Sequence, residues 1–392
     1  MLPLEGITVV SLEQAVAAPF ATRQLADLGA RVIKIERPIS GDFARHYDTT
    51  VDGMSSHFVW INRSKESLTL NLKSDEGKEI LHKLLSEADV FIQNLAPGAV
   101  DRLGFSPQLL KEQYEQLIVC GISGYGSYGP YVDKKAYDLL IQCEAGLVSV
   151  TGTEDAPSKA GISVADIAAG MYAYTGILTA IIQRSRTGKG SIFEVSMLEA
   201  LGEWMGYPLY YSHYGGKEPA RSGASHATIF PYGPFPANDE KFVFFSIQND
   251  REWASFSENI MKRPDLITDE KFKTNSDRVE NKEELRKIIE EGFAAYTADE
   301  LIELLEQAKI ANARLNSVEE FVQHPQLQAR NRWRDVATAN GMIKALLPPA
   351  TFEDFEPVME AIPSVGEHTD NILREFNFDE EFIQRCKDTN TI

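Results

Sequence analysis

The 392-residue chain has few cysteines, scattered histidines and no pattern of metal ligands. Its three cysteines, Cys120, Cys143 and Cys386, are odd in number and widely spaced, which argues against a disulfide framework. The seven histidines are scattered and form no recognisable metal-binding motif, so we expect no metal site. A reducing compartment is the simplest interpretation, and we expect a cytoplasmic protein.

Positive charge and long apolar runs are also scarce. The 39 basic residues against 58 acidic ones give a net charge of −19, so repulsion disfavours nucleic acid and anionic membranes as partners. The most apolar stretch, residues 167–182, is shorter than the roughly 18–20 residues of a membrane span. The first residues do not resemble a secretory signal. A polyanionic ligand would therefore need a few well-placed lysines and arginines.

The first 200 residues alternate strand-like and helix-like segments. Apolar, β-branched runs predict buried parallel strands at 7–12, 31–36, 90–93, 117–122 and 191–196. The intervening patterns predict helices at 18–29, 76–88 and 167–184. This alternation is typical of an α/β fold in which helices cover both faces of a Rossmann-like parallel sheet.

The composition changes near residue 200 and predicts a second, smaller domain. We expect a large α/β domain at 1–200, a linker at 201–224, a small α/β domain at 225–322 and a C-terminal segment, 323–392, that returns to the large domain. A predicted helix at 197–211 runs into the linker, which is rich in Gly, Pro and Ser. The small domain is predicted to contain a strand at 241–247, and the last helix is predicted at 368–386.

Two glycine-rich segments look like nucleotide-binding motifs but lack the required context. Gly124–Gly129 matches G-x-G-x-x-G, yet Pro130 follows and no helix opens there, whereas a dinucleotide fingerprint needs a helix N-terminus. We interpret it as a turn, or as a loop that lets a ligand approach the backbone. Thr187–Gly190 lacks the remaining residues of a phosphate loop and is predicted to be a turn.

Two aspartates open predicted helices and are candidates for chemistry. Asp166 ends a short apolar run and precedes the small residues Ala168–Gly170, which leave room for a ligand. A helix N-terminus favours an ionised carboxylate, so we expect Asp166 to stay charged near pH 7. Asp138 opens another helix. From the local sequence alone, a plain helix cap is the favoured interpretation of both residues.

Basic residues gather in the first domain, several of them after predicted strand ends, where open α/β sheets bind ligands. They are Lys34, Arg37, Arg45, Lys73, Arg102, Lys134 and Lys135. Ordinary surface charge is the alternative interpretation for each of them.

Taken together, these segments resemble the class III CoA-transferases, the CaiB/BaiF family, over essentially the whole chain. The matching segments, in chain order, are LGARVIKIERP at 28–38 with Gly41 and Asp42, QNLAPGAVDRLG at 93–104, SGYG with GP at 123–130, YD through Q to G at 137–146, VADIAAG at 164–170, RTGKG at 186–190 and GEHT at 366–369. So many matches in the right order are specific for the family, though not for a substrate.

The resemblance implies a site, a co-substrate and an assembly. Asp166 falls on the catalytic aspartate, and Asp138 on an acidic position near it. The implied contacts to coenzyme A are Val16, Ala17, Arg37, Leu70 through Lys73, Asn94, Leu95, Arg102, Lys135 and Tyr137. The resemblance also implies acyl-CoA and carboxylate substrates, no metal, and an interlocked homodimer with sites between the large and small domains.

Two departures from the family pattern narrow the expected reaction. Related α-methylacyl-CoA racemases carry His where this chain has Tyr137, and a phenol, which titrates at about pH 10, is a poor base near neutrality. Formyl-CoA transferases close the site with a run of glycines, and the nearest counterparts here are Gly215, Gly216 and Gly223. Formyl and oxalyl substrates are therefore disfavoured.

We therefore expect transfer of CoA from an acyl-CoA donor such as succinyl-CoA to a C4–C5 dicarboxylate. The reaction would pass through an aspartyl anhydride and an aspartyl-CoA thioester, with the Gly124–Gly129 loop as a candidate for oxyanion stabilisation. Arginine forks match carboxylates, and the candidates for the acceptor are Arg45, His46, Arg221 and His226. An acyl-CoA racemase or isomerase and a non-catalytic acyl-CoA-binding protein are the alternatives.

Overall fold

The computed structural model describes residues 1–392, which form two compact units. Unit 1 comprises residues 1–147, 160–207 and 329–392, and unit 2 comprises 148–159 and 208–328. The chain passes from unit 1 to unit 2 inside helix α10 (Gly206–Gly215), so the predicted linker at 201–224 begins as helix. Residues 148–159, expected in the large domain, belong to unit 2, where Gly152 O accepts a 2.8 Å hydrogen bond from Gly223 N.

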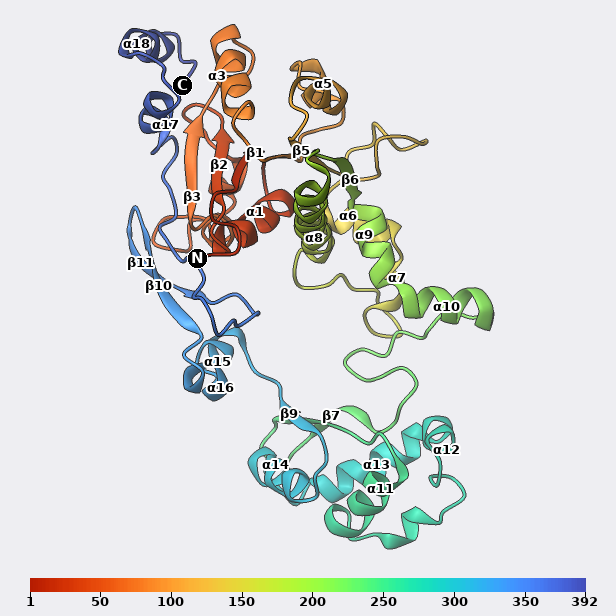
Figure 1. Cartoon of the computed structure of the whole chain (residues 1–392). Coiled ribbons are helices and arrows are strands. Elements are labelled where there is room, and N and C mark those ends of the chain that lie inside the picture. Colours follow the sequence, from red (N-terminus) through yellow and green to blue (C-terminus); the bar gives the residue numbers. More distant parts are fainter. The chain divides into compact units, whose positions relative to one another are not determined.

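Unit 1 is built on a six-stranded parallel sheet in the order β3-β2-β1-β4-β5-β6 (Figure 1). The strands are β1 (Thr8–Leu12), β2 (Arg31–Glu36), β3 (Lys65–Thr69), β4 (Val90–Gln93), β5 (Ile118–Ser123) and β6 (Ile192–Ser196). This is the strand order of the Rossmann fold. The sequence pattern missed β3, because Lys65 and Ser67 look like surface residues but are buried.

Helices cover both faces of this sheet, and alternate residues of β1 point into two separate cores. Val9 packs with α1 (Ala17–Asp27) and α8 (Val164–Thr187). Val10 packs with α3 (Asp75–Leu85), α5 (Pro107–Gln113) and the C-terminal helices. The other helices of unit 1 are η1 (Phe43–His46), α2 (Ser56–Ile61), α4 (Ala99–Arg102), α6 (Asp138–Glu144) and α9 (Met197–Trp204).

Helix α8 runs for 24 residues and lies along α1 (Figure 1). Small residues make this close contact possible: Ala168 and Ala169 are fully buried, and a Cβ on Gly170 would lie 2.7 Å from the carbonyl oxygen of Ala17. By length and composition alone α8 is also apolar enough to cross a membrane, with 39% of its most apolar window buried. Core helices of soluble proteins pass the same test, so this is weak evidence for a membrane span.

The C-terminal part of unit 1 begins with the antiparallel hairpin β10 (Trp333–Thr338) and β11 (Gly341–Leu346). The predicted final helix at 368–386 is two helices, α17 (Thr369–Glu375) and α18 (Glu380–Asp388). The break has local causes, because Asn377 adopts a positive φ of 65° and the Asp379 side chain caps α18. Helix α17 lies beside β3, where His368 N donates to Ser67 O at 3.0 Å (Figure 1).

Unit 2 combines a small antiparallel sheet, in the order β7-β8-β9, with helices. Its strands are β7 (Tyr232–Pro236), β8 (Phe242–Ser246) and β9 (Asn312–Arg314). Its helices are α11 (Asp250–Ser255), η2 (Phe256–Ile260), η3 (Pro264–Ile267), α12 (Asn275–Glu280), α13 (Lys282–Phe293), α14 (Ala298–Gln307) and α15 (Val318–Val322). The short helices α7 (Leu147–Val150) and α16 (Pro325–Ala329) lie at the unit boundaries. Aromatic side chains, among them Phe235, Phe245 and Phe293, form the core.

Candidate active site

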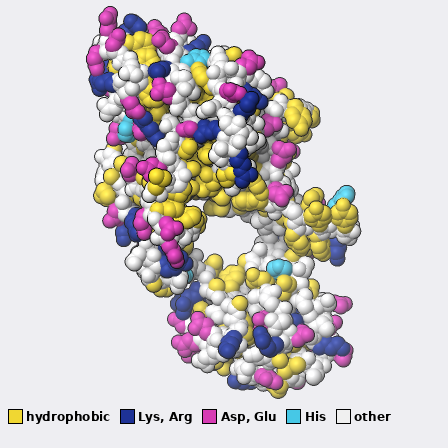
Figure 2. All heavy atoms as spheres, in the orientation of Figure 1, with side chains coloured by type: hydrophobic (Ala, Val, Ile, Leu, Met, Phe, Trp, Pro, Cys, Tyr) yellow, Lys and Arg dark blue, Asp and Glu magenta, His cyan; other side chains and the backbone are white.

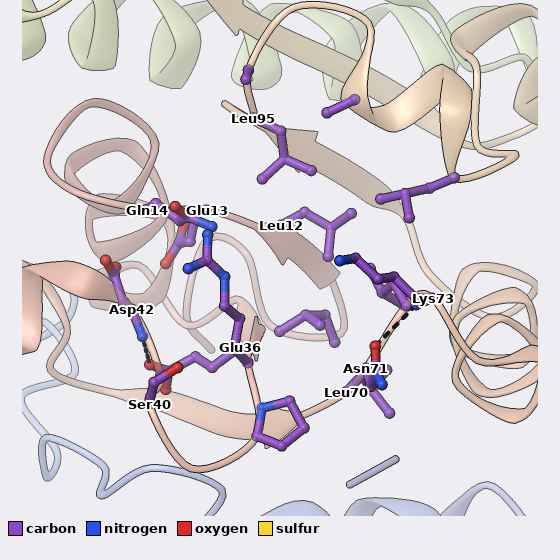
Figure 3. Close-up of a pocket in the computed structure, with 18 of the residues that line it drawn as sticks. Leu12, Glu13, Gln14, Glu36, Ser40, Asp42, Leu70, Asn71, Lys73 and Leu95 are labelled. Carbon is purple, nitrogen blue, oxygen red and sulfur yellow. Dashed lines mark hydrogen bonds between the residues drawn. The ribbon is translucent and has the colours of Figure 1, made fainter. Parts of the chain in front are cut away.

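A cavity of about 880 Å³ opens at the carboxyl ends of strands β1 to β4 (Figure 3). The order of the sheet reverses between β1 and β4, and open parallel sheets bind ligands at this point. The lining includes seven of the residues that the sequence predicts to contact CoA: Arg37, Leu70, Asn71, Leu72, Lys73, Leu95 and Arg102. The cavity therefore brings together residues from four segments of the chain.

Three basic side chains and several leucines give this cavity a mixed character. Arg37, Lys73 and Arg102 are exposed, and none of them forms an ion pair in this structure. Leu12 and Leu95 are among the apolar residues that line the cavity (Figure 3). In a chain with a net charge of −19, three cations without ion-pair partners around one partly apolar cavity suit a ligand that carries both phosphates and an apolar arm.

Six ionisable side chains pack together at one side of the cavity, three of them, Glu13, Glu36 and Asp42, in its lining, and we call them the six-charge cluster. Its three cations and three anions are Lys34, Arg45, Lys65, Glu13, Glu36 and Asp42. Lys34 Nζ lies 2.8 Å from Asp42 Oδ2 and 3.3 Å from Glu13 Oε1. Lys65 Nζ lies 2.7 Å from Glu13 Oε1, and Arg45 forms a two-bond fork to Glu36. The formal charges balance.

The pairing inside the cluster sets the pKa values of its members. Burial alone would raise the pKa of Glu13, but the charges of Lys65 and Lys34 outweigh burial and hold it below its ordinary value. Burial also opposes ionisation of Glu36, whose pKa nevertheless falls to about 2 because of Arg45 and Lys34. The charged form of Lys65 is disfavoured in this arrangement, because burial lowers its pKa to about 7. The pairing thus favours the ionised forms of Glu13 and Glu36.

The cluster fixes the loop that follows β1. Asp42 Oδ1 accepts hydrogen bonds from Ala15 N at 3.1 Å and from Ala44 N at 2.9 Å. Ala15 has a positive φ of 60°, so the loop turns sharply before α1. Asn94 holds the same loop from the other side, because its amide oxygen accepts from Gln14 N and its amide nitrogen donates to Gln14 O, both at 2.8 Å.

This arrangement refines three of the predicted CoA contacts. Asn94 does not line the cavity, since both ends of its amide are engaged with Gln14. Val16 and Ala17 are buried and do not line it either. Any contact of these two residues with a ligand would therefore run through their backbone.

Asp166 and Asp138 lie together at the start of α8. Asp138 is the first residue of α6, and its Oδ1 accepts a 2.8 Å hydrogen bond from Ala165 N. Its Oδ2 accepts from Gln142 Nε2 at 2.7 Å, and Gln142 Oε1 in turn accepts from Ala160 N at 2.9 Å. Asp138 therefore caps α8 rather than its own helix, and the buried Gln142 fixes the segment that leads into α8.

The interpretation of Asp166 as a helix cap is wrong. Asp166 is the third residue of α8, the N-cap position is Ser163, and the Asp166 carboxylate has no hydrogen bond or ion pair. Burial, reinforced by the charge of Asp138, raises the pKa of Asp166 to about 7. The expectation that the helix end keeps it fully ionised is also wrong, because a helix terminus contributes only about 0.3–1 kcal/mol. Asp166 is about half ionised at neutral pH.

Tyr47 is a member of this neighbourhood that the sequence did not single out. It follows η1, and burial together with the charges of Asp42 and Asp166 raises its pKa to about 12. The phenol therefore stays neutral and able to donate a hydrogen bond. Its electrostatic interaction with Asp166 depends on the folded chain, and no local motif marks it.

The loop between β5 and α6 carries the remaining predicted residues of the first domain. Lys135 is exposed and Tyr137 is 66% exposed, and neither lines the cavity. No helix opens in Gly124–Gly129, which confirms that this segment is not a dinucleotide fingerprint. Gly126 N donates to Ser123 Oγ at 2.9 Å, and a Cβ on Gly124 would collide with Ala136. These glycines let the loop pack closely on the residues before Tyr137.

The four residues predicted to bind the acceptor fall in both units. In unit 1, Arg45 does not present a free fork, because Glu36 occupies it and the guanidinium lies over the Phe58 ring. His46 Nε2 lies 3.0 Å from Ser40 O.

In unit 2, Arg221 donates to the carbonyls of Thr153 and Glu154, both at 2.8 Å. The His226 ring stacks on Tyr232, with 5.1 Å between the ring centroids. Only the imidazoles are therefore open to a further partner in this structure.

The fold and the cavity define an α/β protein with a ligand site at the reversal of strand order, and comparison with known proteins specifies its class. The chain matches the model of CoA-transferase family III over residues 4–369. It therefore belongs to this family and is a CoA-transferase. A CoA-transferase uses CoA thioesters as co-substrates, and the structure contains no group of three or more His, Cys, Asp or Glu side chains that would hold a metal.

Individual relatives cover nearly the whole chain. The chain is 32% identical over 378 residues to the succinyl-CoA:glutarate CoA-transferase of Homo sapiens, which covers 95% of this chain and 86% of that protein. It is 35% identical over 331 residues to the acetyl-CoA:oxalate CoA-transferase of Acetobacter aceti, and this match covers 84% of this chain and 85% of that protein. A CaiB/BaiF family protein from Brucella suis has a similar structure, with a TM-score of 0.86, 32% identity and 96% and 100% covered.

Proposed function

We propose that this enzyme transfers CoA from an acyl-CoA donor, preferably succinyl-CoA, to a C4–C5 dicarboxylate, with Asp166 as the nucleophile. The observation that carries the proposal is the Asp166 carboxylate, which is partly buried, unpaired and has a pKa of about 7. Such a group is more reactive than a solvated or ion-paired carboxylate. The succinyl-CoA:glutarate relative supports the choice of substrates, because the two acids in its name, succinate and glutarate, are C4 and C5 dicarboxylates.

Coenzyme A would occupy the large cavity of unit 1. Arg37, Lys73 and Arg102 would pair with its phosphates, since guanidinium and ammonium groups are the usual partners of phosphate oxygens. The leucines of the lining would contact the pantetheine arm. The arm would pass the loop at Val16 and Ala17, which contacts α8 at Gly170, four residues beyond Asp166.

The reaction would proceed through two anhydrides and one enzyme thioester. An Asp166 oxygen attacks the thioester carbonyl of succinyl-CoA, which gives a succinyl-aspartyl anhydride and releases CoA thiolate. The thiolate attacks the aspartyl carbonyl, so succinate leaves and an aspartyl-CoA thioester remains. The acceptor carboxylate attacks this thioester to form a second anhydride and free thiolate. Attack of the thiolate on the acceptor carbonyl then gives the new acyl-CoA and restores the Asp166 carboxylate.

The neighbours of Asp166 would act by position and charge. Asp138 would hold the first turn of α8 through Ala165 N and keep the proton affinity of Asp166 high. Tyr47 would donate a hydrogen bond to a developing oxyanion, since its phenol stays neutral. The Gly124–Gly129 loop remains a second candidate for that role.

The working enzyme would be a homodimer, as the family resemblance implies. Helix α10 supports this proposal, because hydrophobic side chains gather on its surface (Figure 2). Leu209, Tyr210 and Tyr214 are 58%, 64% and 77% exposed. Apolar surface on a helix of this kind marks a contact with another protein chain.

Covalent trapping tests the proposed nucleophile. The enzyme is incubated with succinyl-CoA, treated with hydroxylamine or borohydride, and digested for peptide mass spectrometry. We expect the modification on the peptide that contains Asp166, and none in Asp166→Asn. The matched control is Asp133→Asn, an exposed aspartate that should be labelled like the wild type. An unlabelled Asp166, together with exchange of α-protons in deuterated water, would establish a racemase or isomerase instead.

An acceptor panel tests the substrate class. With succinyl-CoA as donor, glutarate and other C4–C5 dicarboxylates should give higher kcat/KM than oxalate or formate. Oxalate is the informative competitor, because the relative from Acetobacter aceti is an acetyl-CoA:oxalate CoA-transferase. A preference for oxalate would overturn the C4–C5 assignment and leave the role of Asp166 intact. Binding of CoA without turnover of any acid would favour a non-catalytic acyl-CoA-binding protein.

A further inference from the structure

A second, smaller cavity in unit 1 carries an unbalanced positive charge. It measures about 220 Å³ and is lined by residues of α1, of α8 and of the segment 347–357. It shares no lining residue with the large cavity. We propose that this small cavity binds a carboxylate with a compact apolar body, at a site separate from the one used for CoA transfer.

The positive charge comes from two buried arginines that share one aspartate. Arg23 Nη1 lies 2.7 Å from Asp27 Oδ2, and Arg63 makes two hydrogen bonds of 2.8 Å to the same carboxylate. The side chains of Arg23, Asp27 and Arg63 are 9%, 2% and 5% exposed. One guanidinium charge therefore lacks a balancing anion in a place where solvent screens it poorly.

Arg23 itself lines the cavity and has an unused donor. Its Nε–H is buried and has no hydrogen-bond partner, whereas nearly all buried polar groups in folded proteins have one. Burial also lowers the pKa of Arg23 to about 10, although Asp27 opposes this change. A carboxylate in the cavity would lie beside the Arg23 guanidinium and supply the missing negative charge.

Apolar side chains make up much of the rest of the lining, and the segment 347–357 is held in place by hydrogen bonds. Phe352 and Phe355 stack with 4.5 Å between their ring centroids, and Met171 of α8 adds a further apolar surface. Arg332 fixes the segment by donating to Thr351 Oγ1 at 2.8 Å and to the carbonyl oxygen of Pro348. These residues would enclose the body of the ligand and leave its carboxylate to Arg23.

The remaining acidic group of the lining does not supply the missing charge. Glu356 belongs to the segment 347–357, but its carboxylate lies 3.6 Å from Arg334 Nη2. With Glu356 and Asp27 both matched to arginines, the charge on Arg23 stays unbalanced.

The volume limits the size of the ligand. A cavity of about 220 Å³ has room for roughly seven water molecules, at ~30 Å³ each. This is too small for a nucleotide, so CoA cannot be the occupant. An aryl or short branched carboxylate fits both the volume and the mixture of aromatic walls with two arginines, Arg23 and Arg332.

Calorimetric titration of the full-length enzyme with benzoate tests the proposal, and benzamide is the neutral probe of the same shape. We expect benzoate to bind at least about tenfold more tightly than benzamide, because only benzoate balances Arg23. Arg23→Met should lower the affinity for benzoate to that for benzamide, and Arg23→Lys should restore part of it. Equal binding of the two probes, or no binding of benzoate, would overturn the proposal.

Two further variants separate this cavity from the site of CoA transfer. Ala350→Trp adds bulk from the exposed segment without changing any charge, so it should abolish benzoate binding even if Arg23→Met does not fold. Asp166→Asn should leave benzoate binding unchanged. Loss of binding in Asp166→Asn with retention in Ala350→Trp would show that benzoate occupies the acceptor position, and it would refute the proposed site.

Discussion

Unit 1 contains two groups of carboxylates away from bulk water, and the two groups behave in opposite ways. Glu13 is fully buried in the six-charge cluster, yet its pKa is lowered, because Lys65 and Lys34 contact it. Asp166 is less buried, yet its pKa rises to about 7, because burial raises it and the negative charge of Asp138 adds to this effect instead of opposing it. Burial acts to raise the pKa of both carboxylates. The charge of the neighbours therefore decides whether a carboxylate serves the fold or is available for chemistry.

The first and largest expected difference between the two groups concerns activity. Asp166→Asn should lower kcat for CoA transfer by about 10⁴-fold or more, because an amide cannot form the anhydride. The measurement is the rate of succinyl-CoA consumption with glutarate as acceptor. The exposed Asp133→Asn should keep wild-type activity. Turnover within tenfold of the wild type in Asp166→Asn would refute the assigned role.

Breaking the balance of the six-charge cluster should have the next largest effect, and it should fall on stability. Lys34→Met leaves Glu13 and Asp42 with too few cations, so we expect a loss of about 3–5 kcal/mol in the free energy of unfolding. Urea titration followed by circular dichroism measures it. Lys287→Met, at an exposed lysine of unit 2, should change stability by less than about 0.5 kcal/mol. Similar losses in both variants would contradict a structural role of the cluster.

Asp166→Asn should change stability in the opposite direction, so that the variant is more stable than the wild type above neutral pH. The folded protein raises the Asp166 pKa from 3.8 to about 7, so ionisation costs stability increasingly from pH 4 to pH 7 and fully above pH 7. Three pKa units set an upper limit of about 4 kcal/mol, and partial exposure reduces the expected gain to about 2 kcal/mol. Asp166→Asn should therefore melt above the wild type at pH 8 and close to it at pH 4. A variant that is destabilised at pH 8 would exclude this pKa shift.

The smallest expected effect isolates the contribution of Asp138. Wild-type kcat/KM should rise with pH through a midpoint of about 7, as Asp166 loses its proton. Asp138→Asn removes a negative charge but keeps an oxygen that can accept from Ala165 N. The midpoint should therefore move to lower pH by on the order of half a unit, since burial is the larger cause of the shift. An unchanged midpoint would show that burial acts alone.

Much of the fold could be predicted from the sequence, because its central strands are continuous apolar runs. The predicted strands at 31–36 and 90–93 coincide with β2 and β4, and those for β1, β5 and β6 differ by about one residue. Strand β3 could not be predicted from periodicity, since buried Lys65 is indistinguishable from a surface lysine until Glu13 is known to contact it. Long-range ion pairs leave no local pattern.

The candidate site likewise combines residues that could be predicted from the sequence with residues that could not. Local sequence favoured a cap for Asp166, and only the resemblance to CoA-transferases indicated a nucleophile. The cations of the cavity were predicted in the same way, and the structure places them together. Tyr47 and Gln142 could not be predicted, because their roles depend on contacts with segments that lie about 18 or more residues away.

The contact between Gly170 and the Ala17 carbonyl has a consequence for how such an enzyme can diversify. The contact joins the helix of Asp166 to the loop at the edge of the cavity through backbone atoms, with no space for a side chain at residue 170. If Asp166 is the nucleophile as proposed, the distance between bound CoA and its attacking oxygen would be fixed by main-chain geometry. Side chains around the acyl group can be exchanged during evolution while that distance is inherited unchanged, so one scaffold can accept many different acids.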